Sequence, residues 1–145
     1  IFGDIARRCN VILNEVGSEH FKAIFDFANF VQCDEDPQAC YELLTPHIEY
    51  IHIKDAVYED SVNVLCGTGD GQIESILKQA IDRGYEGFLT LEPHLVVFDS
   101  LKDLELEHST ETIQNTVAKD GAEGYKMQYE ALLKILSNIE QEENA

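Results

Sequence analysis

Three residues of types that bind metal ions stand at the ends of three short apolar runs: Asp26, His52 and Glu92. Two carboxylates and one imidazole form a hard, mainly oxygen-donor set. Such a set suits a divalent ion such as Mn²⁺ or Mg²⁺, with Co²⁺ or Zn²⁺ as further options. The alternative is that polar residues stand there only because loops begin where strands end. The pattern predicts a cation site if the fold brings the three side chains to one point.

The elements around these residues alternate between strands and helices. Apolar runs at 21–25, 48–53 and 87–91 predict short buried strands, because they lack the 3.6-residue period of a helix. Helices are predicted where apolar residues recur at helical spacing, from Asp4 to Val16, from Asp36 to Leu44, from Ile73 to Gly84 and over residues 119–139. One helix followed by three strand–helix units is typical of an α/β fold with parallel strands.

The carboxyl ends of such parallel strands share one edge of the sheet, because the connections between them are right-handed. Binding and catalytic residues collect at that edge in α/β proteins. Asp26 and Glu92 directly follow predicted strands, and His52 lies near the end of the strand predicted at 48–53. We therefore expect their side chains to converge there.

The segment 56–71 is expected to be a loop. It ends in the glycine-rich run Gly67-Thr68-Gly69-Asp70-Gly71. This run lacks the pattern of a phosphate-binding P-loop and has no lysine beside it. It is expected to form a tight turn into the following helix.

The chain is strongly acidic. Its 145 residues include 28 Asp and Glu against 10 Lys and Arg, a formal net charge of −18. This length suits one domain with a substantial core. The charge argues against a surface for nucleic acid or anionic membranes, which needs clustered basic residues. No apolar run approaches the roughly 18–20 residues of a membrane span, and no signal peptide is visible.

The four cysteines, at positions 9, 33, 40 and 66, form no C-x-x-C pair. Their spacing matches no zinc-binding pattern. We expect them to be reduced thiols, which indicates a cytoplasmic protein.

Four segments resemble the xylose-isomerase-like family of sugar phosphate isomerases and epimerases: residues 25–29 (FDFAN), 51–55 (IHIKD), 67–70 (GTGD) and 84–94 (GYEGFLTLEPH). Their order and spacing agree with the family over about residues 1–98, and the likeness returns loosely in the final helix. The resemblance implies a TIM barrel that binds one divalent metal ion. In that family a Glu, an Asp, a His and a Glu from the last four strands hold the ion.

The resemblance implies roles for six residues. Asp26, His52 and Glu92 would hold the metal ion, and Glu92 would also transfer a proton as the catalytic residue. Three residues would contact the substrate: Asn29, Lys54 and His94. Asn29 departs from the family, because many relatives have a substrate-binding His there. Lys54 would neutralise a substrate oxyanion or phosphate, although it and His94 could also be ordinary loop residues.

The family's first metal-binding Glu ends a strand just before the helix that here begins near Asp4, and this sequence has no such strand. The resemblance therefore implies the C-terminal half of a (β/α)₈ TIM barrel, with one helix and three βα units. Residues 1–145 would form this partial domain, with an acidic surface insertion or loop at 98–118, a C-terminal helix at 119–139 and a frayed tail at 140–145. A second copy, or an N-terminal half of the barrel, would cover the open sheet edges. Little metal binding or catalysis is expected from such a fragment by itself.

The implied activity is that of a divalent-metal-dependent isomerase or epimerase of a sugar or sugar phosphate, with proton transfer through a metal-stabilised enediolate. The expected partner is a small carbohydrate, with neither nucleic acid nor membrane. Two alternatives stay open. An abasic-site endonuclease shares the barrel but needs extra histidines and a basic rim, which Asn29 and the charge of −18 do not match. A metal-free binding module of the same fold is the second alternative.

Overall fold

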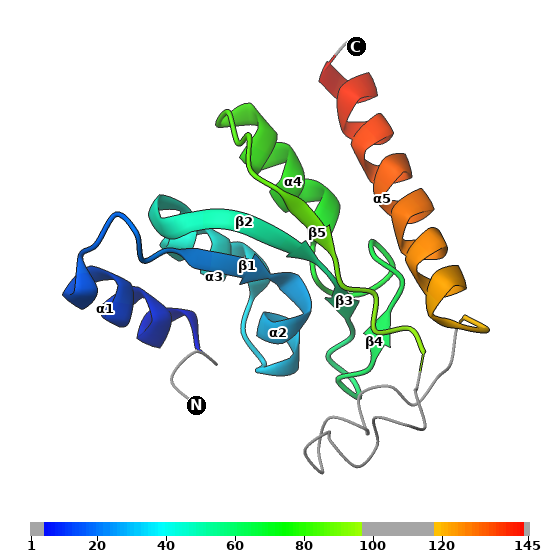
Figure 1. Ribbon diagram of the computed structural model, residues 1–145, viewed down its shortest axis with the longest axis horizontal. Coiled ribbons are helices and arrows are strands. Elements are labelled where there is room, and N and C mark those ends of the chain that lie inside the picture. The colour runs from blue at the N-terminus through cyan, green and yellow to red at the C-terminus, as the bar shows by residue number, and fades with distance from the viewer. Residues whose placement is uncertain (1–4, 97–117, 144–145) are drawn as a thin grey trace.

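The computed structural model of the protein describes residues 5–96 and 118–143 (Figure 1). Asp4, the expected cap of the first helix, lies outside these ranges, as does the acidic segment 98–118 apart from Ala118. None of the described helices is both long enough and apolar enough to cross a membrane.

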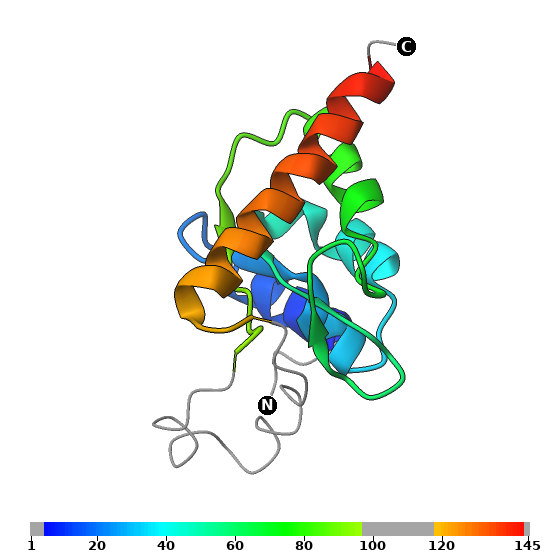
Figure 2. The ribbon, with the colours of Figure 1, turned by 90° about the vertical axis from the view of Figure 1, so that its right-hand side faces the viewer.

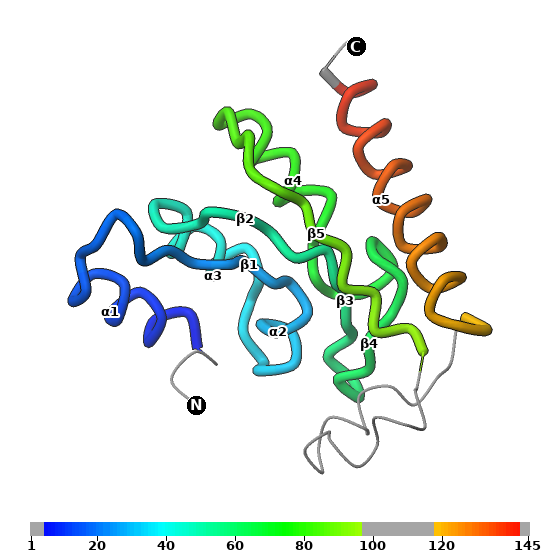
Figure 3. The backbone as a smooth tube through the Cα atoms, in the orientation of Figure 1, coloured from blue at the N-terminus to red at the C-terminus, as the bar shows by residue number. Residues whose placement is uncertain are grey.

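The centre of the structure is a parallel sheet with the strand order β1-β2-β5, formed by β1 (Ala23–Asp26), β2 (Ile48–Ile53) and β5 (Leu89–Leu91). The predicted α/β fold with parallel strands is therefore confirmed. Figure 1 shows the arrows of the three strands pointing in the same direction, so that their carboxyl ends lie at one edge, and Figure 3 traces the chain through them. Within the described residues the sheet is open and closes no barrel. An open parallel sheet of this kind agrees with the partial TIM barrel that the sequence resemblance implies.

Four helices pack with the sheet: α1 (Ala6–Val16), α3 (Pro37–Leu44), α4 (Ile73–Asp82) and α5 (Gly121–Glu143). Their apolar faces share one core with Phe25, Ile51 and Ile53, which are fully buried. Burying one such side chain contributes roughly 1.5–3 kcal/mol relative to leaving it exposed. Because side chains alternate along a strand, the neighbouring residues Asp26 and His52 point to the opposite face. Figure 2 shows α5 lying beside α4.

The helix boundaries follow local signals in the sequence. α3 begins as predicted, with Asp36 accepting a hydrogen bond from the Gln38 backbone N–H at 3.2 Å and a proline in the first turn. α1 has Ile5 at its N-cap position, without a side-chain cap, and ends at Gly17 in the left-handed conformation. Gly84, which was expected to end α4, lies just beyond the end of that helix at Asp82 and has a left-handed backbone, with φ 80°. A 3₁₀ turn, Thr45–His47, links α3 to β2.

A helix that the sequence did not predict, α2 (Phe27–Gln32), follows β1 directly. Four of its six residues are buried: Phe27, Ala28, Phe30 and Val31. A helix with so few polar positions has no amphipathic period to reveal it. Its position matters for the site, because its N-cap residue is Asp26.

Two other elements differ from the predictions. The segment expected to be a loop contains a short antiparallel pair, β3 (Asp55–Ala56) and β4 (Asn63–Val64). The C-terminal helix α5 begins at Gly121 and runs to Glu143, so it extends into the tail that was expected to be frayed. Glu and Gln, which dominate that tail, are good helix formers.

The glycine-rich run forms a turn around one buried carboxylate, that of Asp55. The backbone N–H groups of Gly67, Gly69 and Gly71 each donate to it at 2.9 Å, as does that of Ala56. A Cβ on Gly71 would lie 2.6 Å from Asp55 Oδ1, so this turn requires glycine there. Since these N–H groups already bind Asp55, the run is a turn and not a phosphate cradle, as the sequence indicated.

Candidate metal centre

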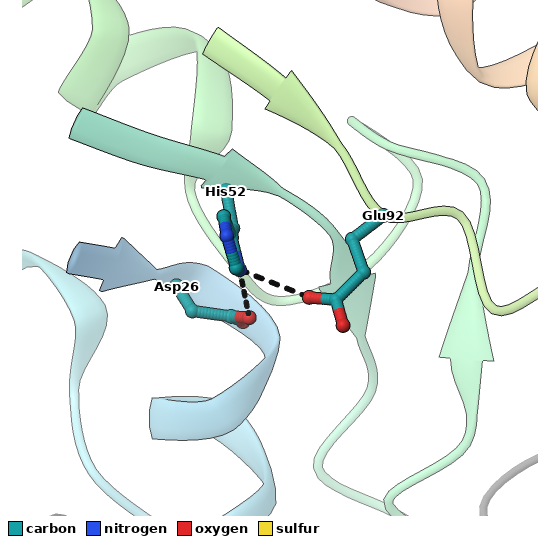
Figure 4. Close-up of side chains that lie close together, drawn as sticks. All are labelled: Asp26, His52 and Glu92. Carbon is teal, nitrogen blue, oxygen red and sulfur yellow. Dashed lines mark ion pairs between the residues drawn. The ribbon is translucent and has the colours of Figure 1, made fainter. Parts of the chain in front are cut away.

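The strand register brings Asp26, His52 and Glu92 to one point at the carboxyl edge of the sheet. Asp26 pairs with His52 across β1 and β2, and His52 pairs with Thr90 across β2 and β5. Glu92 lies two residues beyond Thr90, on the same face. One ligand atom from each of the three residues lies within 4.8 Å of the other two. Figure 4 shows the three side chains pointing toward one another.

His52 stands between the two carboxylates. Its Nδ1 is 3.0 Å from Glu92 Oε2 and 3.5 Å from Asp26 Oδ2 (Figure 4). The side chain of Asp26 is 7% exposed, that of His52 24% and that of Glu92 35%. The cluster is therefore closed on the Asp26 side and open to solvent beside Glu92.

The two oxygens of Asp26 have different surroundings. Oδ1 accepts a hydrogen bond from the Asn29 backbone N–H at 3.0 Å, which caps α2. Oδ2 is buried and has no hydrogen-bond partner among the described residues. Burial raises the pKa of Asp26, against the opposing effects of the Lys54 ammonium and the Asn29 N–H. A buried carboxylate oxygen without a hydrogen bond is costly, and coordination of a metal ion would satisfy it.

Glu92 uses its two oxygens separately as well. Oε1 lies 3.0 Å from His94 Nε2, while Oε2 faces His52. The hydrogen bond with His94, helped by the charge of Lys54, lowers the pKa of Glu92 to about 2. His94 has a left-handed backbone, with φ 43°, which is uncommon for a residue other than glycine. Glu92 is thus an ionised carboxylate at neutral pH.

Lys54 contributes an ammonium group to the same cluster. Its Nζ is 3.4 Å from Asp26 Oδ2 and 3.6 Å from Glu92 Oε2. It also donates a hydrogen bond to Asn29 Oδ1 at 3.0 Å. The structure therefore brings all six candidate residues of the sequence into one cluster.

Tyr50 is a neighbour of the cluster that the sequence reasoning did not single out. Its ring centroid lies 5.5 Å from that of His52, on the same face of β2. The two-residue period of the strand was the available signal, because it places positions 50 and 52 side by side.

The donor set fits a divalent cation. When His52 is neutral, as a metal ligand must be, two carboxylates face one ammonium and the cluster carries an excess negative charge. Carboxylate oxygens with one imidazole nitrogen suit Mn²⁺ or Mg²⁺. The arrangement is a candidate cation site next to a solvent-open carboxylate.

Comparison with known protein families matches residues 6–115 of the chain to the xylose isomerase-like TIM barrel. The chain belongs to this family. The expected resemblance is thereby confirmed. The xylose isomerase-like family includes sugar isomerases and epimerases as well as proteins like endonuclease IV, and its members often bind metal ions.

Two further proteins are similar to part of the chain. It is 30% identical over 79 residues to the Uncharacterized protein YihM of Escherichia coli (strain K12), covering 50% of this chain and 24% of that protein. It also resembles the crystal structure of a xylose isomerase domain protein from Planctomyces limnophilus, with a TM-score of 0.56 and 24% identity. That match covers 63% of this chain and 37% of the other. The chain thus spans less than half the length of either protein.

Proposed function

We propose that this chain carries the metal-binding part of a sugar or sugar phosphate isomerase or epimerase that depends on a divalent ion. The observation that carries the proposal is the juxtaposition of Asp26 Oδ2, buried and without a hydrogen bond from the part of the chain that the structure describes, with His52 Nδ1 and Glu92 Oε2. Membership of a family that includes such enzymes supports it. Mn²⁺ and Mg²⁺ are the ions that the donor set favours.

Asp26, His52 and Glu92 would hold the ion. When bound, it would polarise the carbonyl and hydroxyl oxygens of a substrate and make the neighbouring C–H more acidic. Asp26 is fixed for this purpose by the start of α2, because its Oδ1 already caps that helix. Its other oxygen is thereby directed toward His52.

Glu92 is the residue proposed to move the proton. It is ionised, it lies at the open side of the cluster, and His94 fixes its orientation through Oε1. A carboxylate whose pKa is about 2 is a weak base. It would remove a carbon-bound proton only from a substrate that is strongly acidified, which is consistent with metal-assisted chemistry.

Lys54, Asn29 and His94 are proposed to face the substrate. Lys54 provides the positive charge nearest the two carboxylates, so it would neutralise negative charge that develops on a substrate oxygen. Asn29 and His94 have exposed side chains next to it. The substrate would be a small carbohydrate in the cytoplasm, and the charge of −18 supports a protein that binds neither nucleic acid nor membrane.

The first test is calorimetric titration of the chain with Mn²⁺. We expect weak but saturable binding, because the chain offers only three of the family's four ligands, and a further weakening of about tenfold or more in Asp26→Asn, because the buried anionic oxygen is lost. Asp82→Asn, at an exposed position paired with Lys78, is the matched control and should bind as the unchanged chain does. Absence of any binding would contradict the proposed metal site.

The second test concerns the reaction and uses the whole protein with a panel of aldoses, ketoses and their phosphates. Glu92→Gln should abolish turnover, whereas Glu86→Gln, an exposed glutamate before β5, should leave it unchanged. Unaltered turnover in Glu92→Gln would remove this residue from the mechanism. Cleavage of duplex DNA at abasic sites by the whole protein would favour the endonuclease alternative instead.

A further inference from the structure

The Lys54 ammonium occupies an unusual position for a lysine in a metal-binding cluster. It faces Asp26 Oδ2 and Glu92 Oε2, the two carboxylate oxygens that would coordinate the ion, at 3.4 and 3.6 Å. The same two oxygens face His52 Nδ1. An ion bound to all three donors would therefore lie next to this ammonium.

Burial makes this contact stronger than that of a surface lysine. The side chain of Lys54 is 7% exposed, equal to that of Asp26. Charges that are removed from water interact more strongly than exposed charges, because less solvent screens them. One ammonium beside two carboxylates neutralises half of their charge, whereas a bound divalent ion would neutralise all of it.

Asn29 fixes both partners of this contact. Its side-chain oxygen accepts the hydrogen bond from Lys54 Nζ at 3.0 Å, which is shorter than either ion pair of the ammonium. Its backbone N–H donates to Asp26 Oδ1 at 3.0 Å. One residue thus sets the position of the carboxylate and of the ammonium that faces it.

We propose that Lys54 is an internal counter-ion that competes with the divalent ion for the Asp26–Glu92 carboxylate pair, and that Asn29 is the positioning residue that holds it there. This inference rests on the proposed metal site. It gives the departure from histidine at position 29 a role, because the amide oxygen accepts the lysine's hydrogen bond. The metal affinity of the chain is then set by one of its own side chains.

The test measures Mn²⁺ affinity by calorimetry in the full chain at fixed pH and ionic strength. Lys54→Met keeps much of the length of the side chain but removes its charge, and should bind Mn²⁺ about tenfold more tightly or better, since a nearby positive charge is lost. Asn29→Ala, at an exposed position, should bind Mn²⁺ about two- to fivefold more tightly, because the ammonium is no longer held. Lys78→Met, at a lysine paired with Asp82, is the control and should change nothing.

Thermal unfolding in a chelator supplies a second measurement. Without metal, Lys54→Met should unfold at a lower temperature than the unchanged chain, because its two carboxylates repel each other. Mn²⁺ should then raise its Tm by more than it raises that of the unchanged chain. If Lys54 served only in packing, the substitution would lower the Tm by the same amount in the chelator and in the presence of Mn²⁺.

The outcomes separate the two proposals. If the unchanged chain binds Mn²⁺ and Lys54→Met binds it with equal or lower affinity, the counter-ion role is wrong and the metal site stands. If neither binds Mn²⁺, the proposed metal site fails, and the competition fails with it. Should Lys54→Met not fold, Asn29→Ala decides: unchanged or weaker Mn²⁺ binding overturns the inference.

Discussion

The side-chain amide of Gln128 donates a hydrogen bond to the carbonyl oxygen of Ile53 at 2.9 Å, and so joins the C-terminal helix to the residue that follows His52. The oxygen of the same amide accepts a hydrogen bond from the Cys66 backbone N–H at 3.2 Å. Gln128 is fully buried. It therefore links three segments that are distant in sequence, and one of them carries the candidate metal ligand His52.

Replacing Gln128 with leucine should destabilise the fold by about 1–3 kcal/mol. The change keeps an apolar core but leaves the Cys66 N–H without its acceptor and removes one of the donors to Ile53, and buried polar groups without partners are costly. Urea unfolding followed by circular dichroism measures this. Gln141→Leu, in the same helix but exposed, is the control and should change stability by less than about 0.5 kcal/mol. Equal stability of the two variants would show that the hydrogen bonds of Gln128 contribute nothing.

Replacing Asp55 with alanine should cost about 3 kcal/mol or more, because four backbone N–H groups lose their common acceptor. Chemical unfolding again provides the measurement, and limited proteolysis should show cleavage near residues 67–71. Asp60→Ala removes a single contact, with the Val62 N–H, and should cost about 1 kcal/mol or less. A proteolysis pattern unchanged in Asp55→Ala would contradict the role of this carboxylate.

Replacing His94 with alanine should raise the pKa of Glu92 from about 2 toward its ordinary value of 4.5, because the hydrogen bond is the main cause of its low value. A carboxylate with a lowered pKa stabilises the fold above its ordinary pKa, and this stabilisation is lost as the pH falls from 4.5 to about 2. The variant should lose this part of the acid sensitivity. NMR titration of the Glu92 carboxyl carbon measures this pKa directly. His20→Ala, at an exposed histidine paired with Glu19, is the control and should leave the pKa of Glu92 unchanged.

The cysteines should differ in reactivity according to burial. Burial raises the pKa of Cys40 and of Cys66 to about 12, from an ordinary value of 9.0. At pH 8 both should therefore react with iodoacetamide at least about tenfold more slowly than the exposed Cys33, since the thiolate is the reactive form. Mass spectrometry of the labelled peptides tests this, with the urea-unfolded chain as control. Labelling of Cys40 as fast as that of Cys33 would contradict the burial argument.

The same two thiols predict a loss of stability at alkaline pH. Between about pH 9 and 12 the folded chain retains protons that the unfolded chain releases, so the free energy of unfolding falls as the pH rises through this range. Unfolding curves at successive pH values measure the slope. A double Cys40→Ala, Cys66→Ala variant should show a smaller slope than the unchanged chain, whatever its absolute stability.

The sequence predicted the strands of the sheet and most helices, because each has a local signal. The run at 48–53 is apolar and short, and Asp36-Pro37 is a strong helix start, so β2 and α3 appear where expected. The sequence did not predict α2, because four of its six residues are buried and the two polar ones are too few to mark a helical period. Three candidate ligands were predictable because they end strands that run in parallel. The position of Lys54 between the carboxylates was not, since it depends on side-chain contacts across two strands.

Asp26 combines two tasks that a single substitution would separate: it caps α2, and it offers an anionic oxygen to the candidate metal site. Asn, Ser or Thr at this position would still be able to cap α2, but none of them offers an anionic oxygen to a metal ion. A descendant carrying one of these residues would retain its fold while losing its ligand. If the proposed metal site is right, relatives that have lost the metal are therefore expected to persist as stable chains, and the residue at this helix start would distinguish them from those that bind it.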